Sequence, residues 1–181
     1  MQKFSFVLLG LLLPGMASAL GVHQHGVAQL EVVLEPPLLG VTLHSPLANL
    51  LGFEYAPATA REQARWHELQ QQLRNAGQQL VLPAAAGCRL ESVELVDPFA
   101  GHNNDHDHDH DHDHAHDHAH DHADLAVDYL FRCSQAQHLR QLQLPLLGNF
   151  PAIERLQVRL LMPSGQHQHE LSGGQQELPL P

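Results

Sequence analysis

The stretch from Cys88 to Asp97, CRLESVELVD, and its counterpart from Asp124 to Cys133, DLAVDYLFRC, decide the fold that we expect for this chain. If the two are antiparallel strands, pairing Asp97 with Asp124 also places Cys88 directly opposite Cys133. Directly opposed residues lie about 4.5 to 5.5 Å apart at their α-carbons, which suits a disulfide. The register is therefore self-consistent and predicts a hairpin closed by a Cys88–Cys133 bond. Two buried free thiols are the alternative.

Between the two predicted strands, residues 105–122 read DHDHDHDHDHAHDHAHDH, with histidine at every even position. Neutral imidazole is the commonest side-chain ligand for zinc, nickel and copper. In an extended chain a period of two puts the imidazoles on one edge and the carboxylates on the other. We expect a disordered, flexible loop at 101–123 that binds Zn²⁺, roughly two to four ions at two to four imidazoles each. The candidate ligands are His102, His106, His108, His110, His112, His114, His116, His118, His120 and His122.

The alternative for this run is a solvated, low-complexity spacer, because a segment without apolar residues cannot bury enough surface to offset its ordering entropy. That alternative describes the expected structure well. It does not explain the composition, since a spacer needs only polar residues and not histidine at every second position.

The first 19 residues have the pattern of a signal peptide. Lys3 supplies a positive start, residues 4–13 are almost wholly apolar, and Ala17-Ser18-Ala19 forms a small-x-small cleavage site. A membrane anchor is the weaker alternative, because about ten apolar residues fall short of the ~20 that cross a bilayer. We expect a soluble exported protein that begins at Leu20, is not inserted in the membrane, and matures where thiols oxidise. Cleavage one residue later would instead expose Gly21-Val22-His23, which suits square-planar copper(II) or nickel(II).

Residues 20–181 are predicted to form a single zinc-binding domain of the α+β class, mostly antiparallel β and sandwich-like, with one main helix. Thr59 and Glu62 make a capping box for a helix over 60–76, in which Trp66 is the expected core anchor. Pro36-Pro37 and Gly40 mark a turn after the first strand. Besides the disulfide-linked pair, the expected strands are 26–35, 41–44, 139–144, 153–162 and 166–171, and no pattern is visible from Ser172 onward.

Charge and motifs exclude two classes of function. Lys3 is the only lysine, and the chain has nine basic against twenty acidic residues, so nucleic-acid binding is not expected. The sequence has no HExxH, no GxSxG, no phosphate-binding glycine loop and no redox pair of cysteines. We therefore do not expect an enzyme.

Two further His-x-His pairs lie at the edges of predicted strands. His23 and His25 stand just before the first strand, and His167 and His169, followed by Glu170, lie in the last one. Two histidines with a carboxylate can hold zinc and leave a coordination position open. The remaining histidines, which we interpret as surface or hydrogen-bonded residues, are His44, His67 and His138.

The order of these motifs resembles that of the zinc-regulated protein A (ZrgA) family of periplasmic zinc-binding proteins from Gram-negative bacteria. The matching residues are 23–30 (HQHGVAQL), Ser45-Pro46, Asn49, 52–57 (GFEYAP), 86–88 (AGC), the His/Asp run, 128–133 (DYLFRC), Phe150-Pro151, 154–156 (ERL) and 164–166 (SGQ). The resemblance implies a periplasmic protein that binds zinc and assists its import, with a zinc ABC transporter or its periplasmic receptor as partner.

This chain departs from the family pattern at one position, because Tyr55 stands where the family favours histidine. The departure leaves His23, His25 and Glu54 as candidate ligands. A packed turn is the alternative for Phe53-Glu54-Tyr55.

The first hypothesis for the function of the whole protein is a zinc-binding accessory protein for uptake. A sink that detoxifies nickel or copper, and an interaction module whose metal-ordered loop docks on a transporter or on a second copy, are the alternatives.

Overall fold

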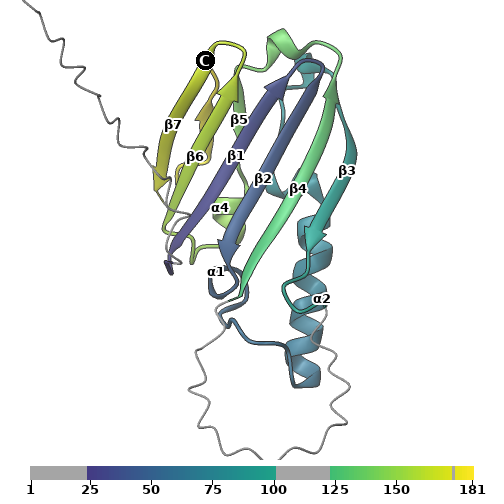
Figure 1. Ribbon diagram of the computed structural model, residues 1–181, viewed down its shortest axis with the longest axis vertical. Helices are drawn as coiled ribbons and strands as arrows, with labels where there is room; N and C mark the ends of the chain where they lie inside the picture. Colours follow the sequence, from purple (N-terminus) through teal and green to yellow (C-terminus); the bar gives the residue numbers. More distant parts are fainter. Residues whose placement is uncertain (1–23, 101–122, 173) are drawn as a thin grey trace, which may run out of the picture.

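The computed structural model describes residues 24–100, 123–172 and 174–181, and its main element is a six-stranded sheet (Figure 1). The strands are β1 (Val27–Glu35), β2 (Leu38–Pro46), β3 (Cys88–Val96), β4 (Asp124–Cys133), β6 (Arg155–Met162) and β7 (Gly165–Ser172), in the order β3-β4-β2-β1-β6-β7. Neighbours are antiparallel except β1 and β6, which are parallel. The predicted α+β, mostly antiparallel fold with one main helix is confirmed. The predicted signal peptide lies outside the described residues, as does all of the predicted loop at 101–123 except Ala123.

A second layer of shorter elements covers one side of this sheet. It contains α1 (Ala48–Leu51), α2 (Ala60–Arg74), α3 (Ala76–Gln79), α4 (Leu146–Asn149), two 3-10 turns at Ala84–Ala86 and Ala136–His138, and a small antiparallel sheet of β5 (Gln141–Gln143) and β8 (Glu177–Pro179). Figure 1 shows α2, α4 and β5 behind the large sheet. The tail after Ser172, in which no pattern was visible, thus supplies the strand β8. It forms because β5 offers backbone partners with which it pairs.

The core lies between the two layers, and strand alternation explains why. In β1, Leu30 and Val32 are buried, whereas Gln29 and Glu35 are exposed. The same alternation continues in β4, where Val127 is fully buried. Successive side chains of a strand point to opposite faces. One face of the sheet therefore packs against the helices, and the other carries the polar and charged residues.

The first hairpin is confirmed, with a tighter turn than predicted. Pro36 and Pro37 alone connect the strands, and β2 begins at Leu38. Gly40, which the sequence placed in the turn, pairs with Val33 inside the sheet. Glycine is frequent in turns but does not require one.

The main helix, α2, begins at its predicted cap. The Thr59 side chain accepts a hydrogen bond from the Glu62 N–H, and the Glu62 carboxylate accepts one from the Thr59 N–H, at 3.2 and 2.9 Å. Trp66 is buried against the core as predicted. The helix ends at Arg74, two residues earlier than expected. The hydroxyl of Tyr129 donates to the Leu73 carbonyl at 2.7 Å and so ties β4 to this helix, while burial raises the pKa of Tyr129.

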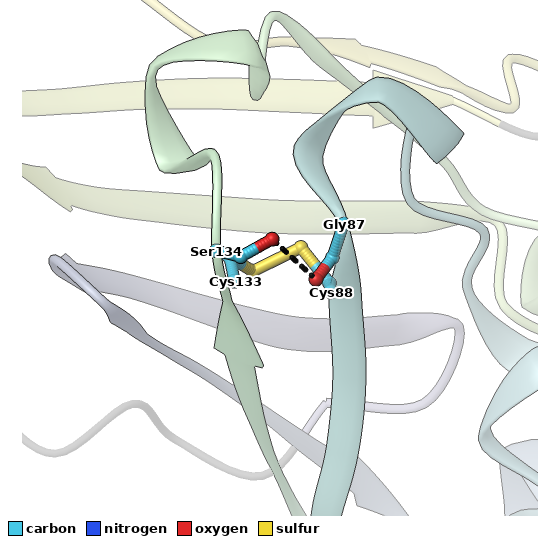
Figure 2. The surroundings of a disulfide bond; sticks show 4 residues. All are labelled: Gly87, Cys88, Cys133 and Ser134. Carbon is cyan, nitrogen blue, oxygen red and sulfur yellow. Dashed lines mark hydrogen bonds between the residues drawn. A yellow bond between two sulfur atoms is a disulfide. The ribbon is translucent and has the colours of Figure 1, made fainter.

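The predicted disulfide between Cys88 and Cys133 is present and closes the β3–β4 hairpin (Figure 2). The two residues are directly opposed, with their α-carbons 3.8 Å apart. Gly87, at φ +57°, precedes the bond, and an added Cβ would collide with the Ser134 hydroxyl, which donates to the Gly87 carbonyl at 3.4 Å. The left-handed backbone and this contact both favour glycine at position 87.

The predicted register is wrong at the far end of the hairpin. A bulge between Leu90 and Ser92 adds one residue to β3, so Val96 pairs with Ala126. Asp97 consequently does not face Asp124. A β-bulge inserts an extra residue on one strand without disturbing the pairs on the other side of it, which is why the disulfide end agrees with the prediction.

The described parts of the chain contain no helix that is both long and apolar enough to span a bilayer.

Candidate metal site

Most of the predicted metal ligands lie outside the described residues. They are His23, His102 and the nine histidines at even positions of the run 105–122. The predicted ligands that the structure describes are His25 and Glu54, at one end of the sheet, and His167 and His169, on β7.

The structure brings His25 and Glu54 together. His25 stands just before β1, and Glu54 lies in the loop that connects α1 to α2. The Nε2 atom of His25 is 2.9 Å from the Oε1 atom of Glu54. The Glu54 side chain is 12% exposed, whereas that of His25 is 63% exposed. The carboxylate is therefore largely buried, whereas the imidazole beside it is open to solvent.

This spacing is close to what two zinc ligands require. Zinc takes imidazole nitrogen and carboxylate oxygen at about 2.0 to 2.1 Å, so two ligands at a tetrahedral angle lie about 3.3 Å apart. The His25 nitrogen and the Glu54 oxygen would separate by only a few tenths of an ångström to admit an ion. The exposure of His25 leaves room for further ligands from water or another segment.

The turn that carries Glu54 is packed on both sides of that residue. Phe53 and Tyr55 stack with ring centroids 5.0 Å apart, and the Arg65 guanidinium lies 5.7 Å from the centre of the Phe53 ring. Arg65 also donates to the Leu51 carbonyl at 2.5 Å. The packed turn predicted as the alternative describes Phe53, which packs against the core, whereas Tyr55 stacks on it from the surface and is 56% exposed. The turn leaves the Glu54 carboxylate beside His25.

Tyr55, which occupies the position of the family's histidine, is engaged with α2. Its hydroxyl donates to Glu62 Oε1 at 3.0 Å. The hydrogen bond to the Glu62 carboxylate raises the pKa of Tyr55, and the bonds from the Thr59 backbone and hydroxyl, and from Tyr55, lower the pKa of Glu62. Tyr55 thus anchors the Glu54 turn to the first turn of α2.

Asn49 holds the segment that carries His25, a role that the sequence did not predict. Its Oδ1 accepts from the Gly26 N–H at 2.8 Å, and its Nδ2 donates to the Val27 carbonyl at 3.0 Å and to Ser45 Oγ at 3.3 Å. Asn49 is 5% exposed. The signal that could have found this role is an asparagine that stands among apolar residues. Such an amide, once buried, needs hydrogen-bond partners inside the protein.

The other predicted pair, His167 and His169, has a different environment. Both are half-buried on the core side of β7, where they pair with Leu160 and Val158. The Nε2 atom of His167 is buried and has no hydrogen-bond partner among the residues that the structure describes. Glu170, the neighbouring carboxylate, alternates to the other face. Among residues 24–100, 123–172 and 174–181, no three His, Cys, Asp or Glu side chains gather closely enough to hold a metal ion.

The segments that flank the His/Asp run lie at the end of the sheet where β1 begins and where α1 lies (Figure 1). The Ala123 carbonyl accepts from the N–H of Leu47, the residue before α1, at 2.9 Å. On the other flank, Phe99 packs edge-on against Trp66 of α2 with ring centroids 5.7 Å apart. Both flanks are therefore fixed next to the two helices that frame the Glu54 loop.

A cavity at the opposite end of the sheet is unsuited to a metal ion. It has a volume of about 550 Å³ and is lined mainly by apolar side chains, among them Leu80, Val81 and Leu90, with Arg74 at its edge. Its one residue of a metal-binding type, Cys88, is bonded to Cys133.

Comparison with known proteins agrees with these observations. No curated protein matches the chain. The family model described as ZrgA family zinc uptake protein matches residues 22–180, which include the His25–Glu54 pair, the disulfide and the whole His/Asp run. Because this match covers most of the sequence, the chain belongs to the ZrgA family of zinc uptake proteins.

Proposed function

We propose that this protein is a periplasmic zinc-binding protein that captures zinc through the run 105–122, holds an ion at His25 and Glu54, and assists zinc uptake. The observation that carries the proposal is the 2.9 Å approach of the His25 nitrogen to the Glu54 oxygen. Both atoms are zinc donors, and they belong to segments that only the folded chain brings together. Zinc is the cargo of this site.

The arrangement suits an ion that must be both captured and released. The run supplies many interchangeable imidazoles, and its carboxylates raise the local concentration of divalent cations. Its flanks at Phe99 and Ala123 are fixed near the Glu54 loop. Because the His25 side chain is 63% exposed, an ion held there stays within reach of a partner protein.

The location and the partner follow from the same reasoning. Residues 1–19 have the pattern of a signal peptide, and the Cys88–Cys133 disulfide suits an oxidising compartment. A zinc ABC transporter or its periplasmic receptor would accept the ion. The protein itself acts without catalysis, by binding and transfer.

A metal-competition titration of the mature protein tests the proposal. The first variant replaces the nine histidines of 106–122 by asparagine, which keeps the length and the carboxylates; a second lacks residues 102–122. The third is His25→Ala, with His67→Ala, an exposed histidine on α2, as its matched control. We expect the run variants to lose roughly two to four ions and to keep one. His25→Ala should lose that one, and His67→Ala should lose none.

The outcome that contradicts the proposal is wild-type zinc binding in both the asparagine variant and His25→Ala. Gene regulation separates uptake from the alternative of a nickel or copper sink. Expression that rises on zinc starvation supports uptake, and expression that rises only on metal excess supports the sink.

A further inference from the structure

Asn49 is the buried residue that connects the two halves of the candidate site. It lies in α1, whose last residue, Leu51, is three positions before Glu54, and it bonds to the start of β1 next to His25. Both polar atoms of its side-chain amide form hydrogen bonds. The oxygen accepts from the Gly26 N–H, and the nitrogen donates to the Val27 carbonyl and the Ser45 hydroxyl. One side chain therefore contacts the strand that follows one ligand and belongs to the helix that precedes the other.

The bond to Gly26 has a direct effect on His25. A peptide unit is planar, and the plane that contains the Gly26 N–H also contains the α-carbon of His25. By accepting from that N–H at 2.8 Å, Asn49 Oδ1 fixes the plane from which the imidazole projects. The Gly26 carbonyl is held as well, by the Glu154 and Arg155 N–H groups at 2.8 and 3.0 Å. The backbone at His25 is thus held by α1 on one side and by β6 on the other.

The segment that carries Glu54 is tied to the same helix, α1. The Leu51 carbonyl at the end of α1 accepts from Arg65, which also lies over the Phe53 ring next to Glu54. At the other end of α1, the Leu47 N–H binds the Ala123 carbonyl. A shift of α1 relative to β1 would consequently change the separation of the His25 nitrogen and the Glu54 oxygen.

We infer that Asn49 is a positioning residue for zinc, which sets the His25–Glu54 separation through its bond to Gly26. The inference rests on the proposed function of this pair. Groups that orient metal ligands without touching the metal typically change metal affinity by about 10- to 100-fold when they are removed. Because Asn49 acts through the backbone, we expect Asn49→Ala to weaken zinc binding at the folded site about tenfold, at the lower end of that range.

The experiment measures zinc-dependent stabilisation of the full mature chain by urea unfolding with and without saturating free zinc. Zinc bound by the His/Asp run in the unfolded as well as the folded chain contributes little to this difference. A tenfold weaker site lowers the zinc-dependent increment by about 1.4 kcal/mol. A residue that only stabilises the fold would lower the stability equally with and without zinc and leave the increment unchanged.

Gln79→Ala is the matched control. Gln79 is also a buried amide, 0% exposed, and its Nε2 donates to the Gln72 carbonyl at 2.8 Å. It lies in α3, beyond the far end of α2, whose first turn adjoins the Glu54 loop. The control should lower the stability of the zinc-free protein and keep the full zinc increment.

Asn49→Asp separates positioning from stability. It keeps an oxygen for the Gly26 N–H but can no longer donate to Val27 and Ser45. We expect it to destabilise the protein and still retain the zinc increment. If Asn49→Ala does not fold, Asn49→Gln provides the same test, because the longer side chain keeps the amide and displaces the Gly26 peptide.

The results distinguish the inference from the proposed function. A wild-type increment in Asn49→Ala, together with a lost increment in His25→Ala, overturns the role of Asn49 and leaves the site intact. A wild-type increment in His25→Ala overturns the site itself. A reduced increment in Asn49→Ala with a full increment in Gln79→Ala supports the inference.

Discussion

The His/Asp run and the His25–Glu54 pair bring metal-binding side chains together by different means. In the run, histidines stand two residues apart, so their proximity is guaranteed by the covalent chain. In the pair, the two side chains meet at 2.9 Å only because β1, α1 and the loop after it pack in one arrangement. Zinc binding by the run should therefore survive unfolding, whereas zinc binding by the pair should depend on the fold.

The largest expected effect is the response of the two regions to pH. Ligation requires neutral imidazole, whose ordinary pKa is about 6.5, so each coordinating histidine costs roughly tenfold in affinity between pH 7.5 and 5.5. Sites in the run that use two to four imidazoles should therefore lose about 100- to 10,000-fold. The pair has one imidazole, so its zinc affinity should fall less steeply than that of the run.

Titration calorimetry at the two pH values, on the wild type and on the variant with asparagine in place of the nine run histidines, checks this difference. The expected sign is weaker binding at lower pH in both proteins, with a steeper loss in the wild type. Equal affinity at both pH values would contradict ligation by imidazole in either region.

The second effect separates the regions by their dependence on the fold. The Cys88–Cys133 disulfide joins residues 45 positions apart. On the chain-entropy model, a closed loop of this length stabilises the folded state by about 4 kcal/mol, so the double variant Cys88→Ser/Cys133→Ser should unfold at lower urea concentration. In urea that unfolds only the variant, the run should still bind zinc. The zinc ion of the pair should be lost there.

The variant in which asparagine replaces the run histidines, combined with the two serine substitutions, is the control. It should bind no zinc once it has unfolded. Retention of one tightly bound ion by this unfolded chain would remove the distinction between the two regions.

The smallest effect concerns the anchor of the Glu54 loop on α2. Replacing Thr59 by alanine removes the hydroxyl that accepts from the Glu62 N–H and should destabilise the protein by about 1 kcal/mol. The pKa of Glu62 is lowered in the folded state, chiefly by the hydrogen bond from the Thr59 backbone. A lowered pKa means that this contribution is present above the ordinary glutamate pKa and is lost as the pH falls through the folded value.

Urea unfolding from pH 7 to pH 3 measures this contribution, with Glu62→Gln as the comparison. The glutamine variant should show a smaller loss of stability on acidification than the wild type. An identical pH profile would mean that the capping box does not stabilise the carboxylate form.

The sequence predicted those parts of the fold that local chemistry specifies. The Thr59–Glu62 capping box and the Trp66 core position depend on residues a few positions apart, and both are confirmed. The Cys88–Cys133 pairing followed from counting residues along two strands. The same count failed beyond the bulge at Leu90 and Ser92. The strand β3 is partly exposed on both faces, so its apolar and polar residues do not alternate clearly enough to reveal one extra residue.

Other features could not be predicted because their cause lies far away in the chain. The parallel pairing of β1 with β6 depends on the path of everything between them. The tail strand β8 depends on β5, which presents an edge for it. The apolar surroundings of Asn49 indicate a buried amide, but its partners could not be named in advance because they belong to β1 and β2.

The sequence by itself determined which atoms this protein offers to a metal, since side-chain chemistry and the two-residue spacing of the run do not depend on folding. It also determined the helix cap and the disulfide partners, for which the decisive distances are short or countable. Only the tertiary structure decided that Glu54 meets His25 and that the Asn49 amide lies against the start of β1. The physical reason is that such meetings depend on strand register and on buried hydrogen bonds, and these are settled by the packing of the whole chain.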